Sequence, residues 1–160
     1  MNDDRIRAIK IGALCGVALM VITMITRVVQ ERFLGSVQSP GDYFAHTDAF
    51  FIAVMLLSIA ILLLAGAFSV KYGASHIKNR SGSIAFGVIA GLSASVTFIL
   101  ITYAISMFIA IMQEAGTTLS LEYLSMLLYS AAFSLLILSI VSVVFSTVGA
   151  VGYAIIKLKV

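Results

Sequence analysis

Four long apolar segments alternate with short polar segments along the chain. This pattern predicts helices over residues 8–34, 49–70, 83–112 and 123–156. At 1.5 Å per residue, the last three reach or exceed the roughly 30 Å of a bilayer's hydrocarbon core, whereas the uncharged part of the first, residues 11–26, spans only about 24 Å. The third and fourth helices are expected to be longer than the first two. At roughly 45 and 50 Å they would tilt or protrude from the lipid.

The polar segments between these helices are short. One of them holds the turn signal Ser39-Pro40-Gly41-Asp42, which contains the only proline of the chain. Short connections make consecutive helices antiparallel neighbours. The sequence therefore predicts an all-α, up-down-up-down bundle of four transmembrane helices, forming a single domain over residues 1–160.

Composition supports a membrane protein. Hydrophobic residues make up 61% of the chain and charged residues 11%, whereas a soluble domain carries about 25% charged residues. The lipid bilayer is therefore the first expected partner. The net charge of +3 is small, and the few cations of any one segment give no basis for nucleic-acid binding.

The positions of the cations predict an orientation. Eight of the ten lysines and arginines fall at the two termini or in the middle connection: Arg5, Arg7, Lys10, Lys71, Lys78, Arg80, Lys157 and Lys159. Because cytoplasmic segments are rich in Lys and Arg, we expect a multi-pass protein of the cell membrane with both termini cytoplasmic. Lys10, Arg27, Lys71, Lys78 and Arg80 are the expected anchors at the membrane interfaces.

Two G-x-x-x-G pairs mark expected helix contacts. They are Gly12 with Gly16, and Gly87 with Gly91, the latter followed one turn later by Ser95. Small residues let helix backbones approach in lipid, where the hydrophobic effect does not hold helices together. The sequence leaves open whether these faces pack within one chain or against a partner.

The fourth predicted helix carries a stripe of small residues. Ser139, Ser142, Ser146 and Gly149 follow a 3-4-3 spacing, which places them on one packing seam. Membrane serines often bond the carbonyl four residues earlier and need not line water. The stripe fits either tight packing or a polar conduit between the two hairpins.

The two halves of the chain share a faint similarity. Residues 1–80 and 81–160 each form one predicted hairpin, and each first helix contains a G-x-x-x-G pair. We therefore consider a hairpin duplication.

Polar residues precede the second predicted helix. Thr47 or Asp48 is the expected N-cap of that helix, and His46, Asp42 and Glu31 form a possible polar cluster on the outer side. A histidine with carboxylates can ligate a divalent cation, but this spacing is not diagnostic. We therefore expect no metal and no cofactor.

No Asp, Glu, Lys, Arg or His falls at mid-membrane depth in the predicted helices, and the chain contains no H-E-x-x-H, C-x-x-C or G-x-S-x-G motif. The sequence favours a small non-catalytic protein, a structural or accessory subunit that packs against itself as a homo-oligomer or against a larger membrane complex. The alternative is an oligomeric channel or facilitator for a small solute.

Overall fold

The chain folds into four long helices. The computed structural model describes residues 3–29, 32, 40–73, 80–113 and 121–158. The helices are α1 (Asp3–Val29), α2 (Pro40–Gly73), α3 (Arg80–Gln113) and α4 (Leu121–Tyr153), and a π-helical turn, η3 (Ala154–Leu158), continues α4. All four helices contain segments long and apolar enough to cross a membrane. This confirms the predicted all-helical fold, and four helices of this length and hydropathy fit a multi-pass membrane protein.

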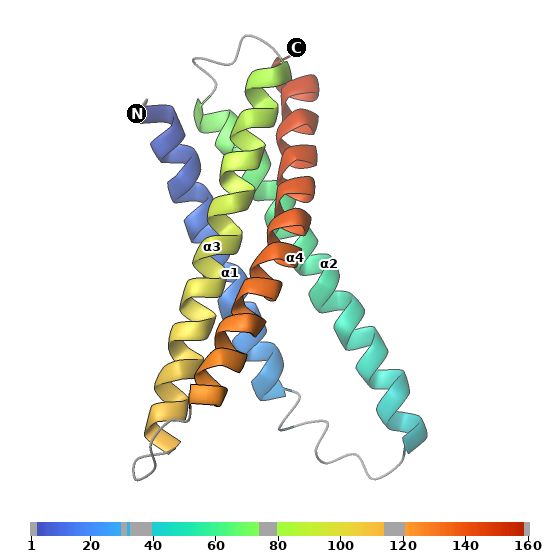
Figure 1. Cartoon of the computed structure of the whole chain (residues 1–160). Coiled ribbons are helices and arrows are strands. Elements are labelled where there is room, and N and C mark those ends of the chain that lie inside the picture. The colour runs from blue at the N-terminus through green and yellow to red at the C-terminus, as the bar shows by residue number, and fades with distance from the viewer. Residues whose placement is uncertain (1–2, 30–31, 33–39, 74–79, 114–120, 159–160) are drawn as a thin grey trace.

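Consecutive helices run in opposite directions (Figure 1). The start of α1, the end of α2, the start of α3 and the end of α4 lie at one end of the molecule, and the other four helix ends lie at the opposite end. Helix α3 packs most closely against α1 and α4, while α2 packs against α4 and, less closely, against α1. Helices α1 and α4 therefore lie on opposite sides of the bundle.

Small residues fill the half of the bundle that contains the termini, which we call the closed end. The alanines with no exposed surface are Ala8, Ala65, Ala90, Ala94, Ala150 and Ala154. Val70 is also fully buried there and packs with Ala150 and Ala154 against Phe86 and Tyr153. Such residues bring backbones close together, which favours helix association in lipid.

The helices separate in the other half, which we call the open end. No described residue between 50 and 61 of α2, 100 and 109 of α3 or 125 and 141 of α4 is buried. Figure 1 shows the first turns of α2 leaving the other helices. Helices α3 and α4 stay joined there, because the Tyr103 hydroxyl oxygen lies 2.9 Å from the Ser130 Oγ and 3.4 Å from the Ser134 Oγ.

The helix lengths differ from the sequence prediction. Helix α2 begins at Pro40, nine residues before the predicted start at residue 49, and its 34 residues equal those of α3. The expected greater length of the last two helices is therefore not confirmed for α2. The apolar pattern marked only the lipid-compatible part of α2, whereas a proline is well tolerated in the first turn of a helix.

Candidate functional site

Gly12 and Gly16 lie against α3. A β-carbon on Gly12 would meet the Ala90 carbonyl oxygen and stand 2.8 Å from the Ser93 Cβ. One turn later, a β-carbon on Gly16 would meet the Ala94 carbonyl oxygen and stand 2.9 Å from the Thr97 Cβ. The first glycine pair therefore holds the backbones of α1 and α3 in contact.

Gly87 and Gly91 lie against α4. Added β-carbons would stand 2.7 Å from the Thr147 Cα and 2.7 Å from the Ser142 carbonyl oxygen, respectively. Gly149 in turn lies against α2, where its added β-carbon would stand 2.9 Å from the Leu63 Cα. These contacts place α2 and α3 against the same stretch of α4.

Gly66 completes the contact between α2 and α4, although it is not among the glycines predicted from the sequence. A β-carbon there would meet the Ser146 carbonyl oxygen and stand 2.8 Å from the Ala150 backbone nitrogen. Its sequence signal is the run Ala65-Gly66-Ala67 inside an otherwise large-residue helix. That run lacks G-x-x-x-G spacing, which explains the omission.

The predicted glycines therefore lie at contacts within one chain. The two G-x-x-x-G pairs also contact different kinds of neighbour, since the first pair of α1 meets α3 and the second pair of α3 meets α4. The first pair thus joins the two hairpins, whereas the second pair joins the two helices of one hairpin. The hairpin duplication stays a prediction.

The small polar stripe of α4 lies at the same contacts. Ser95 of α3 is fully buried and its Oγ lies 3.0 Å from the Ser139 Oγ, while it also donates to the Leu92 carbonyl oxygen at 2.9 Å. Ser142 and Ser146 are fully buried, and their hydroxyls have no hydrogen-bond partner among the described residues. These serines pack between helices.

The structure does not describe the side chains of the predicted polar cluster. Glu31 lies outside the described residues, and the side chains of Asp42 and His46 do as well. The predicted N-cap is wrong, because α2 begins at Pro40 and Thr47 and Asp48 lie about two turns inside the helix. The apolar run begins only at Ala49, whereas the helix begins nine residues earlier.

Three of the predicted interface anchors are described with their side chains. Lys10, Arg27 and Lys71 are exposed, and the Lys71 Nζ lies 5.3 Å from the centre of the Tyr72 ring, within cation–π range. Lys78 lies outside the described residues, and Arg80 is described only as the first residue of α3. A shallow 280 Å³ hollow at the closed end is lined by Arg7, Lys10, Ile11 and Tyr72.

A larger cavity lies where the four helices separate. It has a volume of 500 Å³ and is lined by Leu19, Thr23, Met55, Ser58, Ile59, Leu62, Phe98, Leu138, Val141 and Phe145. Both hydroxyls in this wall are bonded to their own helices: Thr23 donates to Leu19 at 2.9 Å and Ser58 to Val54 at 2.8 Å. The wall is therefore apolar in character.

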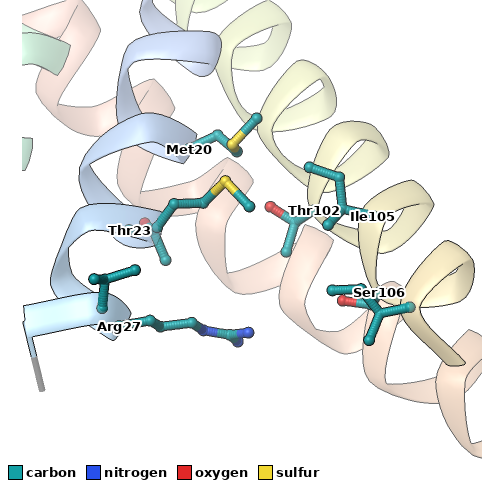
Figure 2. A pocket seen from close by; sticks show the side chains of 9 residues that line it. Met20, Thr23, Arg27, Thr102, Ile105 and Ser106 are labelled. Atoms are coloured by element: carbon teal, nitrogen blue, oxygen red, sulfur yellow. The ribbon is translucent and has the colours of Figure 1, made fainter. Parts of the chain in front are cut away.

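A groove lies between α1 and α3 at the open end. It has a volume of 290 Å³ and is lined by Met20, Thr23, Met24, Arg27, Val28, Thr102, Ile105, Ser106 and Ile109. Figure 2 shows Arg27 extending from α1 across the mouth of this groove, with Thr102 lying deeper and directing its hydroxyl toward α1. The Thr102 Oγ1 is buried and has no hydrogen-bond partner among the described residues. The groove thus combines an apolar wall, one cation and an unsatisfied hydroxyl.

The described residues contain no group of three or more His, Cys, Asp or Glu side chains that could hold a metal ion. Cys15 is a free, half-buried thiol beside Leu19 and Ala94. Neither feature assigns a chemical activity to the bundle.

The chain was compared with protein families, curated proteins and solved structures, and none of them matches it. Functional conclusions therefore rest on its own geometry.

Proposed function

We propose that this chain is a small, non-catalytic integral membrane protein that serves as a structural or accessory subunit, and that its partner packs at the open end. The observation that carries the proposal is the unequal packing of the two halves. The small residues at the closed end pack against other helices of the same chain, whereas α2 and α4 separate at the open end.

The exposed residues of α4 at the open end support this proposal. Met126, Tyr129, Phe133 and Leu136 are 75%, 85%, 67% and 61% exposed. Met and the aromatic residues are enriched at protein interfaces. A transmembrane helix of a partner subunit, or of a second copy, that packs on this face of α4 would bury them.

We also propose that the closed end faces the cytoplasm. Arg5, Arg7, Lys10, Lys71 and Lys157 all lie toward that end. A concentration of Lys and Arg is typical of cytoplasmic segments.

Site-specific photocrosslinking tests the proposed partner surface. Benzoylphenylalanine is placed in α4 at Leu136. The matched control places it at Val148, a residue of the closed end that is 56% exposed. In the source membrane we expect a discrete protein adduct from Leu136 and lipid adducts alone from Val148. Equal adducts at both positions, or lipid alone at both, would refute the proposal.

A facilitator for a small solute is the second candidate. The 500 Å³ cavity supports it, but the wall is apolar and would suit an apolar solute better than an ion. Proteoliposomes loaded with ions, water or small polar solutes should show no flux above protein-free vesicles if the subunit proposal is right. Flux that falls when Ser58, a residue of the cavity wall, becomes leucine would favour the facilitator instead.

A further inference from the structure

We infer that the groove between α1 and α3 binds one phospholipid, with its phosphate at Arg27 and an acyl chain along the groove wall. The inference does not depend on a protein partner. It is based on how charge, hydroxyl groups and apolar side chains follow one another along the groove.

The register of α1 and α3 places these groups in order. Gly12 meets Ala90 and Ser93, and Gly16 meets Ala94 and Thr97, so residues of the two helices at equal depth differ by about 80 in number. The same offset, continued along both helices, places Thr23 beside Thr102 and Arg27 near Ser106. Both pairs line the groove.

The mouth of the groove fits a phosphate. Arg27 is the charged residue among those lining the groove, and its side chain crosses the mouth (Figure 2). A guanidinium group carries fixed positive charge and donates to phosphate oxygens in a bidentate manner. Ser106, at nearly the same depth, offers a second donor from α3.

The next turn fits the ester region of a phospholipid. Thr23 and Thr102 lie one helical turn deeper than Arg27, about 6 Å along the helix axis. Thr23 already donates to Leu19, whereas the Thr102 hydroxyl has no partner among the described residues. An acyl ester carbonyl at this depth would accept a hydrogen bond from Thr102.

The apolar wall fits an acyl chain. Met24 and Ile105 line it at depths between those of Arg27 and the two threonines, and Met20 lines it about one turn deeper than Thr23. Methionine adapts its shape to irregular apolar ligands. A free phosphate ion would satisfy Arg27 and leave this wall uncovered. A phospholipid would pair its phosphate with Arg27, accept a hydrogen bond from Thr102 and cover the apolar wall with an acyl chain.

Native mass spectrometry of the purified, delipidated chain tests the inference with dioleoyl phosphatidylglycerol as the probe. We expect one retained lipid per chain, about a tenfold loss of affinity in Arg27→Gln, and a loss of roughly threefold in Thr102→Val. Arg32→Gln is the matched control, because Arg32 is also exposed but does not line the groove. It should bind lipid like the unmodified chain.

Two further probes separate the sources of binding. Dioleoylglycerol, which lacks the phosphate, should bind at least tenfold more weakly than dioleoyl phosphatidylglycerol, and inorganic phosphate at millimolar concentration should not displace the lipid. Equal binding of dioleoylglycerol, displacement by inorganic phosphate, or equal losses in Arg27→Gln and Arg32→Gln would overturn the inference. Circular dichroism of each variant verifies that the helices are intact, and Arg27→Lys, which keeps the charge, should restore part of the affinity.

Discussion

Gly66 of α2 and Ser146 of α4 bring two helix backbones into direct contact. A β-carbon on Gly66 would stand 2.7 Å from the carbonyl carbon of Ser146. Because that atom belongs to the backbone of another helix, it can move away only if α2 and α4 separate. The absence of a side chain at residue 66 therefore determines how closely the two helices pack.

Gly66→Ala should destabilise the bundle. Overpacking of a tight contact costs about 1–3 kcal/mol, and thermal unfolding in detergent, followed by circular dichroism, measures the loss. Gly152→Ala in α4 is the control, because a β-carbon there meets no atom within 4 Å. It should be neutral or should stabilise by up to about 1 kcal/mol. Equal shifts in both variants would contradict the backbone contact.

Gly12→Ala and Gly16→Ala should lower stability without changing the assembly state. Both glycines face α3 of their own chain, so the same cost of about 1–3 kcal/mol applies. Crosslinking in native membranes measures the assembly and unfolding in detergent measures the stability. Loss of an oligomer with unchanged unfolding would show that these glycines contact a second chain.

Ser95 and Ser139 should show a measurable coupling. Their hydroxyl oxygens are 3.0 Å apart across the contact of α3 and α4, and such bonds between membrane helices average about 0.6 kcal/mol. A double-mutant cycle with alanine at both positions measures this value. Ser142→Ala is the control and should cost little, since the Ser142 hydroxyl has no partner among the described residues. A coupling near zero would show that the Ser95–Ser139 bond adds nothing to the contact.

Cysteine labelling tests the orientation. In a Cys15→Ala background, Arg32→Cys and Lys157→Cys each place one exposed thiol near opposite ends of the bundle. A membrane-impermeant maleimide should label residue 32 in intact cells and residue 157 only after permeabilisation. The reverse pattern would mean that the positive-inside distribution does not set this protein's orientation.

The number of helices and their approximate positions could be predicted because each span is a long apolar run, and lipid permits a spanning chain few alternatives to the helix. The start of α2 could not be predicted in this way. Residues from Pro40 to Asp48 are helical although they include two aspartates and a histidine, and hydropathy reports compatibility with lipid but does not mark the end of a helix.

The contact residues were predictable in kind but their neighbours were not. G-x-x-x-G spacing identified Gly12, Gly16, Gly87 and Gly91 as residues of close approach, yet nothing in the spacing distinguishes α3, α4 or a second chain as the neighbour. The groove at Arg27 was missed for a related reason. It depends on the separation of α1 and α3 beyond Gly16, and that separation is a property of the packed bundle.

The separation of the helices also gives the molecule a wedge shape. The helices lie closest together near the middle of the molecule and are most widely separated at the open end (Figure 1). A bundle of this shape that spans a bilayer displaces more lipid from one monolayer than from the other. Its free energy in the membrane then depends on local curvature, so the protein should concentrate where the monolayer around its open end is stretched.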